Sequence, residues 1–241
     1  MKQLAQKLKD GSMQVLEVPS PVLGPGMVLV QNAFSVVSAG TEGSTVTAAR
    51  KSLLGKAKER PQQVKQVLDV LFQQGPVQTY RAVMKKLDAW SPLGYSCAGR
   101  VIGVAPDVSA FSVGDLVACG GLSASHAEVV AVPANLCVKL ALDADLKKAA
   151  YNTLGAIALQ GVRQADLRLG ETCAVIGLGL IGQLICLLLK AGGMRVVGID
   201  VDEWAVGVAA KHCADLAFLR NHSGIEERID AFTGGVGADA V

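Results

Sequence analysis

Short apolar runs separated by glycine and proline fill much of the first part of the chain. Residues 13–45 contain the runs Met27–Val30 and Phe34–Val37, and such runs between turn residues are typical of β-strands. The pattern returns over residues 93–140. There the apolar runs are Arg100–Val104, Leu116–Ala118, Ala127–Val132 and Cys137–Leu140. Short strands at irregular spacing predict a small β-barrel.

Residues 46–90 interrupt the β pattern with apolar residues spaced three and four positions apart, on both sides of a break at Gly75-Pro76. This spacing is that of one face of an amphipathic helix, so we predict a helical insertion. The apolar positions are Val64, Val67, Leu68, Leu71, Phe72, Tyr80, Val83, Met84 and Leu87. The segment holds nine Lys or Arg residues and three acids. It could bind a phosphorylated or acidic ligand, but we favour a solvated helix face.

From about residue 145 the chain alternates helices and strands, which predicts a parallel, doubly wound α/β sheet. We place the domain boundary after residue 148, so that residues 1–148 form the barrel domain and residues 149–241 the α/β domain. The predicted helices are Leu146–Val162, Leu180–Ala191, Glu203–His212 and Gly224–Phe232, and the predicted strands are Thr172–Ile176, Arg195–Ile199 and Leu216–Leu219.

Composition narrows the class of protein. The chain has 241 residues, of which 51% are hydrophobic and 18% charged, with a net charge of +2. Such a chain is long enough for two domains and too apolar for disorder, and its charge does not favour nucleic acid or a membrane surface. Six cysteines without a C-x-x-C pair predict a reducing, cytoplasmic setting. Cys97 is a candidate reactive thiol, although a buried packing role is favoured.

The central motif is a glycine-rich turn between a predicted strand and a predicted helix. Gly177, Gly179 and Gly182 form a G-x-G-x-x-G pattern, and Leu178, Leu180 and Ile181 stand between them. The first glycine permits the tight turn, the second lets a pyrophosphate approach the backbone, and the third brings the helix close to the strand. The helix start then offers free amides to the phosphates. We therefore predict that residues 177–182 bind a dinucleotide.

Asp200 directly follows the next predicted strand, 23 positions after Gly177. A carboxylate at this offset accepts hydrogen bonds from the adenosine ribose hydroxyls. It would also repel a 2′-phosphate, so NAD is favoured over NADP. The alternative is that Asp200 or Asp202 only caps the following helix.

A barrel followed by such a unit resembles the medium-chain dehydrogenase/reductase family, which contains the zinc-type alcohol dehydrogenases and their zinc-free relatives. The resemblance implies a GroES-like barrel and a Rossmann domain. The helical segment is similar to that of bacterial bi-domain oxidoreductases, in which a second oxidoreductase domain follows. The motifs are Ala39–Glu42, Leu93–Gly99, Val113–Val117, His126–Glu128 and Gly177–Gly182.

The chain departs from this family at the positions of the zinc ligands. The resemblance places Ala39, Tyr95 and Thr153 where zinc alcohol dehydrogenases have their catalytic ligands, and the four-cysteine structural zinc lobe has no counterpart. A catalytic zinc needs three protein ligands with N, S or O donors. We therefore expect no bound zinc.

Without a metal, hydrogen-bond donors must polarise a substrate carbonyl. By the resemblance, Thr41, Tyr95 and Thr153, or else Asn152, lie near the reacting atoms, with Thr41 in the place of a proton relay and Tyr95 as general acid. Tyr95 could instead only fill space. Glu42 could contact the residues that touch the substrate, or it could be a carboxylate at the end of a strand in water.

The three histidines lack ligand spacing, so packing or surface roles are favoured for them. The segment Gly234–Val241 resembles the approach to a fourth Rossmann strand, which suggests a fragment of a longer protein. The first strand of the sheet would then be an open edge.

Three functions remain compatible with the sequence. The first is an NAD-dependent, zinc-independent oxidoreductase that acts on an alcohol or carbonyl, with a substrate that could be phosphorylated or sugar-linked. The second is a non-catalytic nucleotide-binding or assembly module. The third is a quinone or enoyl reductase that uses NADPH, against which Asp200 counts. Either a homo-oligomer or a C-terminal partner domain is compatible with the sequence.

Overall fold

The computed structural model describes residues 1–50, 72 and 75–241. Within them the chain separates into two compact units, Met1–Asn152 and Thr153–Val241. The boundary predicted after residue 148 lies a few residues before this division. Each unit has its own sheet and its own hydrophobic core.

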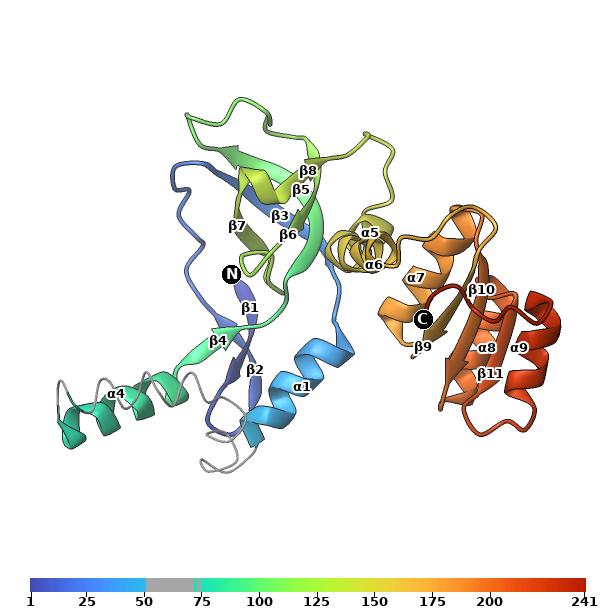
Figure 1. Cartoon of the computed structure of the whole chain (residues 1–241). Coiled ribbons are helices and arrows are strands. Elements are labelled where there is room, and N and C mark those ends of the chain that lie inside the picture. The colour runs from blue at the N-terminus through green and yellow to red at the C-terminus, as the bar shows by residue number, and fades with distance from the viewer. Residues whose placement is uncertain (51–71, 73–74) are drawn as a thin grey trace. The chain divides into compact units, whose positions relative to one another are not determined.

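The first unit is built on a curled antiparallel sheet of five strands, in the spatial order β7-β3-β5-β6-β8 (Figure 1). Alternate side chains of these strands point inward, and the core includes Val28, Val30, Val117 and Val132, all fully buried. This curled sheet confirms the predicted barrel-like fold. The strands are β3 (Met27–Ser35), β5 (Ser96–Val104), β6 (Leu116–Gly120), β7 (Val129–Pro133) and β8 (Cys137–Lys139), and a single 3-10 turn (Ala134–Leu136) joins the last two.

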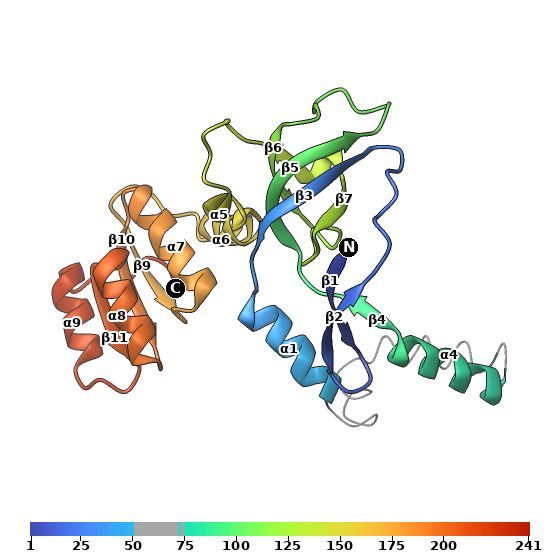
Figure 2. The same cartoon turned by 180° about the vertical axis from the view of Figure 1, so that it is seen from behind.

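A second, smaller sheet lies beside it in the order β2-β1-β4 (Figure 2). Its strands are β1 (Lys2–Lys7), β2 (Met13–Glu17) and β4 (Trp90–Pro92). The sequence pattern did not predict β1, because lysine and glutamine outnumber its apolar residues. Long-range backbone bonds hold this strand: the Leu4 amide donates to the His126 carbonyl at 2.8 Å, and the Leu93 amide donates to the Leu4 carbonyl at 3.1 Å.

Helix α1 (Ala39–Arg50) corrects the prediction that the β pattern continues to residue 45. The Glu42 amide donates to the Ser38 carbonyl at 2.8 Å, and the Ser38 amide donates to Glu42 Oε1 at 3.0 Å. The first is an ordinary helical bond, and in the second the Glu42 side chain accepts from the amide just before the helix, as the glutamate of a capping box does. The segment is rich in glycine and threonine, which are poor helix formers, so this local pairing outweighs intrinsic propensity.

Helix α4 (Pro76–Asp88) confirms the second part of the predicted helical segment. It starts directly after Gly75, whose φ of 79° is in the left-handed region, and Pro76 stands in its first turn. The predicted apolar stripe from Val64 to Leu71, and most of the basic residues, lie outside the described residues.

The single helix predicted over Leu146–Val162 is in fact two helices, α5 (Leu146–Ala149) and α6 (Asn152–Gln164). At the junction of the two helices, side chains from the barrel sheet and from α6 form hydrogen bonds with backbone carbonyls. The Ser96 hydroxyl donates to the Ala150 carbonyl at 2.6 Å. The Asn152 amide nitrogen donates to the carbonyls of Cys97 and Cys119, each at 3.1 Å. These bonds fix the junction against the barrel sheet.

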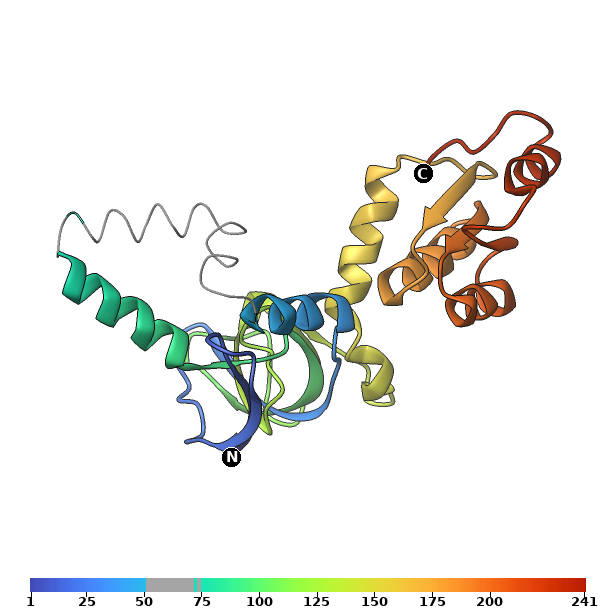
Figure 3. The same ribbon diagram turned by 90° about the horizontal axis from the view of Figure 1, so that it is seen from below.

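The second unit contains a parallel sheet in the order β11-β10-β9, which confirms the predicted Rossmann-type alternation. Helices α7 and α8 pack on one face of the sheet, and α9 packs on the other (Figure 3). The elements are β9 (Thr172–Ile176), α7 (Leu180–Ala191), β10 (Arg195–Asp200), α8 (Glu203–His212), β11 (Leu216–Leu219) and α9 (Ile225–Thr233).

β9 lies at the edge of this sheet, as predicted, and that edge is partly covered by the end of the chain. Ala240 forms a parallel bridge with Cys173, and the Ala174 amide donates to the Ala240 carbonyl at 2.9 Å. The apolar stretch 173–189 is divided between β9 and α7. None of the helices in the described part of the chain has the length and apolar character needed to span a membrane.

Candidate functional site

Two glycines of the turn between β9 and α7 are required by the protein backbone itself. Gly177 has a φ of 96°, a conformation that other residues rarely adopt. At Gly182, a Cβ would approach the Gly177 carbonyl oxygen to 1.9 Å. The first turn of α7 therefore lies directly against the end of β9, as expected from the spacing of the motif.

The protein backbone does not itself require a glycine at the middle position of the motif, Gly179. Gly179 has a φ of −67° and no protein atom within 4 Å of the place a Cβ would occupy. It caps the start of α7, where no side chain satisfies the helix amides. The first amides of a helix lack intrahelical acceptors and attract anions. The turn thus offers open space, free amides and a positive dipole end, which fit the diphosphate of a dinucleotide.

Asp200 lies beside this turn, at the end of the neighbouring strand β10. Its carboxylate accepts hydrogen bonds from the amides of Leu178, Val201 and Asp202. The bonds from Asp202 and Leu178, and then from Val201, hold the pKa of the Asp200 carboxyl below its usual value. At neutral pH the group is therefore an anion.

Leu178 and Gln183 support the turn from inside the unit. The Leu178 side chain is 1% exposed and packs against Gly198, where a Cβ would come within 3.0 Å of it. The Gln183 side chain donates to the Leu178 carbonyl at 3.0 Å and to the Ala205 carbonyl at 2.9 Å. The role of Gln183 was missed from the sequence. Its only sign in the sequence was an amide side chain within the apolar first turns of a predicted helix.

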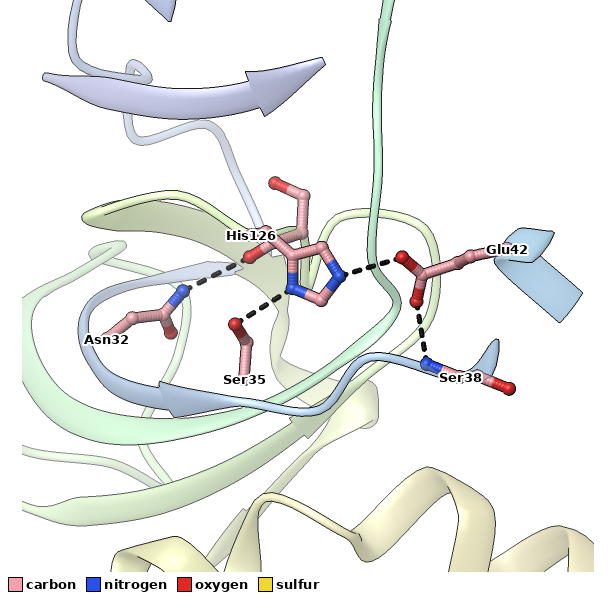
Figure 4. A network of polar contacts seen from close by, with 6 residues as sticks. Asn32, Ser35, Ser38, Glu42 and His126 are labelled. Carbon is pink, nitrogen blue, oxygen red and sulfur yellow. Dashed lines mark hydrogen bonds and ion pairs between the residues drawn. The ribbon is translucent and has the colours of Figure 1, made fainter. Parts of the chain in front are cut away.

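The barrel unit contains a polar network around His126. The ring of His126 contacts Ser35 through Nδ1 at 2.8 Å and Glu42 through Nε2 at 3.0 Å (Figure 4). The side chains of His126 and Glu42 are 8% and 10% exposed. The sequence favoured ordinary packing or surface exposure for this histidine, and no spacing motif identifies the network, because its members come from separate segments.

Two predicted catalytic residues, Thr41 and Tyr95, are chain neighbours of residues that contact His126. Thr41 directly precedes Glu42 in the first turn of α1 and is exposed. Tyr95 follows Gly94, and a Cβ on Gly94 would come within 2.9 Å of the His126 ring. Tyr95 itself is half-buried between β4 and β5.

Thr153 and Asn152 stand at the start of α6. Thr153 is half-buried and belongs to the second unit. The Asn152 amide nitrogen contacts the carbonyls of Cys97, Cys119 and Ala149. These contacts give Asn152 a role in holding the barrel strands to the helix junction.

The described residues do not fit the ligand set of a catalytic zinc. No group of three His, Cys, Asp or Glu side chains comes together in the described part of the chain. Ala39 has no donor atom. Glu42 and His126 have side chains that can bind zinc, but here they form a hydrogen bond with each other.

No protein-family model matches the chain. Curated relatives do match it. It is 32% identical over 151 residues to D-guloside 3-dehydrogenase of Shigella flexneri, covering 62% of this chain and 43% of that protein. It is 25% identical over 174 residues to a probable D-xylulose reductase A of Arthroderma otae, covering 60% of this chain and 49% of that protein. The matched region thus spans less than half the length of these relatives.

Solved structures with the same fold cover nearly the whole chain. Galactitol-1-phosphate dehydrogenase from Escherichia coli superposes with a TM-score of 0.73 and 16% identity, over 100% of this chain and 67% of that one. The Escherichia coli quinone oxidoreductase complexed with NADPH superposes with a TM-score of 0.70 and 18% identity, over 98% and 63%. These matches show that the chain has the fold of these dehydrogenases and quinone oxidoreductases, in which a curled antiparallel sheet is followed by a parallel sheet of the Rossmann type.

Proposed function

We propose that this chain is the barrel and nucleotide-binding part of an oxidoreductase that uses NAD to interconvert an alcohol and a carbonyl compound. The observation that supports this most is the turn at Gly179, where open space and unsatisfied helix amides lie beside the anionic Asp200. The curated relatives are named dehydrogenases and reductases, in agreement with this class of reaction.

The residues of the second unit would hold the cofactor. The amides of Leu180 and Ile181 at the start of α7 would donate to its phosphates, and Asp200 would accept from the adenosine ribose. Bound there, a nicotinamide dinucleotide supplies the hydride acceptor or donor. Asp200 would repel a 2′-phosphate, which favours NAD. This counts against the NADPH-dependent reductase as a second candidate.

The proposed donors to the substrate oxygen are Thr41 and Tyr95 of the barrel unit and Thr153 of the second unit. We propose that the Tyr95 hydroxyl donates a proton to the substrate oxygen as it gains charge, and that Thr41 and Thr153 provide further hydrogen bonds. We propose that no zinc takes part, since Ala39, Tyr95 and Thr153 stand at the ligand positions implied by the family resemblance. Metal analysis of the purified chain should find no stoichiometric zinc, and stoichiometric zinc would overturn this part of the proposal.

The substrate class follows from the relatives. The names D-guloside 3-dehydrogenase and D-xylulose reductase point to sugars and polyols. We therefore propose a hydroxyl-rich substrate with one secondary alcohol or ketone at the reacting carbon.

A pair of glycine substitutions tests the nucleotide site directly. Gly179 and Gly207 both have no protein atom within 4 Å of a new Cβ, and neither has a positive φ. Calorimetric titration with NAD should show binding to the unchanged chain and to Gly207→Ala. Gly179→Ala should bind at least tenfold more weakly, because its methyl group occupies the phosphate approach. Equal affinity in the two variants would contradict the proposal.

The choice of cofactor is tested by Asp200→Asn. Losing the charge should weaken NAD binding roughly tenfold or more, which is the order of magnitude of a charge-assisted hydrogen bond, and should bring NADP affinity closer to NAD affinity. Stronger binding of NADP than NAD by the unchanged chain would overturn the assignment of Asp200.

A further inference from the structure

At the end of β3, hydrogen bonds connect a serine to a histidine and the histidine to a carboxylate. Ser35 Oγ lies 2.8 Å from His126 Nδ1, and His126 Nε2 lies 3.0 Å from Glu42 Oε2 (Figure 4). A nucleophile within hydrogen-bond reach of a base, which a third group orients, is the arrangement that activates hydroxyl groups in covalent catalysis. No part of the proposed oxidoreductase function uses Ser35.

The carboxylate fixes the direction of the hydrogen bonds. An ionised Glu42 can only accept, so His126 Nε2 must donate to it. In the neutral ring the lone pair then lies on Nδ1, opposite the Ser35 hydroxyl, and Ser35 must be the donor. The serine proton therefore points at a base, and the oxygen keeps its lone pairs for attack.

Surrounding contacts hold both partners of Ser35 in place. Glu42 Oε1 accepts from the Ser38 amide at 3.0 Å. The Asn32 side-chain nitrogen donates to the carbonyls on either side of His126, to Ser125 at 3.2 Å and to Ala127 at 2.7 Å. On the other side, Gly94 leaves no room for a Cβ against the ring. A base held in this way loses little entropy when it takes up a proton.

The serine is accessible although its base is buried. Ser35 is exposed and faces an open depression of about 340 Å³. The lining includes Ser35, Asn32, Phe34, Val15, Gln3 and His126. Phe34 and Val15 are 46% and 57% exposed, and they give the depression apolar walls. A small apolar acyl group fits these surroundings.

We propose that Ser35 is a base-activated nucleophile that accepts an acyl group from a small activated ester. Ser35 Oγ attacks the acyl carbon, and its proton passes to His126 Nδ1 while Glu42 stabilises the resulting imidazolium. The new Oγ–carbon bond forms as the bond from the acyl carbon to the leaving oxygen breaks. The leaving group departs as an anion, and the imidazolium then releases its proton to water. The order of the ring nitrogens is the reverse of that in the Ser-His-Asp triad, but each residue has the same role.

The test uses p-nitrophenyl acetate with the purified chain at pH 8, and it needs neither cofactor nor oxidoreductase activity. Release of p-nitrophenolate should be accompanied by one acetyl group on Ser35, located by peptide mass mapping. Because a positioned general base contributes roughly 10²–10⁴-fold in rate, Ser35 should be acetylated at least about 100 times faster than the exposed Ser112, which lies away from this network.

The variants separate activation from folding. Ser35→Ala removes one exposed hydroxyl and should abolish the fast acetylation, whereas Ser112→Ala should leave it unchanged. His126→Gln and Glu42→Gln should each slow acetylation of Ser35 by at least tenfold while the circular dichroism of the chain is retained. Acetylation of Ser35 no faster than that of Ser112, or acetyl transfer that stops at His126, would overturn the proposal.

Discussion

The backbone amide of Leu178 donates a hydrogen bond to the carboxylate of Asp200, 22 positions further along the chain. This bond ties the turn after β9 to the end of β10. It also orients the carboxylate beside the start of α7, where a dinucleotide is proposed to bind. The same carboxylate therefore stabilises the loop geometry and provides the proposed contact to the ribose.

The pH dependence of unfolding should report this bond. The folded-state pKa of Asp200 is lowered, so its stabilising effect is present above the ordinary carboxyl pKa of about 4. The effect is lost as the pH falls through the lower folded-state value. Asp200→Asn should thus lower the free energy of unfolding of the second unit at pH 7, and the difference from the unchanged chain should shrink by pH 3.

Fluorescence of Trp204, in a Trp90→Phe background, follows this unit during urea unfolding. A difference between the two proteins that is the same at pH 3 and pH 7 would contradict the role assigned to the Asp200 carboxylate.

Gly182→Ala should destabilise the second unit, although alanine is the better helix former by roughly 1 kcal/mol. A Cβ at this position would approach the Gly177 carbonyl oxygen to 1.9 Å. Overpacking of this kind costs about 1–3 kcal/mol or more. Gly161→Ala is the matched control, because its Cβ would make only an ordinary contact with Ile185 at 3.6 Å. Urea denaturation should show a lower midpoint for Gly182→Ala and not for Gly161→Ala.

Much of the second unit could be predicted from the sequence because its strands are buried apolar runs and its helices have apolar faces. β9 and α7 fall on their predicted residues, and the glycine spacing located the turn between them. Local pattern and tertiary packing agree in this unit. β10 extends one residue past its predicted end, to Asp200.

The first unit was harder to predict because long-range contacts decide its structure. β1 is held by pairing with β2, β4 and the segment around residue 126. The start of α1 depends on the Ser38–Glu42 pair, and the break at residues 150–151 depends on Ser96 and Asn152. The His126 network could not be found from spacing, since Ser35 and His126 are 91 positions apart.

Gln183→Met should destabilise the glycine turn between β9 and α7. Methionine has a similar size, but it leaves the Leu178 carbonyl without its side-chain donor and removes a second donor from the Ala205 carbonyl, which lies inside α8. An unsatisfied buried acceptor costs about 1–3 kcal/mol. We therefore expect a lower midpoint of urea unfolding together with weaker NAD binding. The exposed Gln160→Met on α6 should change stability by less than about 0.5 kcal/mol. If Gln183→Met unfolds at the same midpoint as Gln160→Met, the supporting role of Gln183 is wrong.

The cysteines should be unreactive while the chain is folded. All six are free thiols with buried side chains. Burial, together with the nearby Cys213 thiol, raises the pKa of Cys186 to about 12, and burial also raises the pKa of Cys173. Since the thiolate is the reactive form, iodoacetamide at pH 8 should leave the native chain almost unmodified and should alkylate every cysteine in 6 M urea. Mass spectrometry counts the adducts in each state. Rapid modification of Cys97 in the native chain would contradict its assignment as a packing residue, because Cys97 lies fully buried in the barrel core.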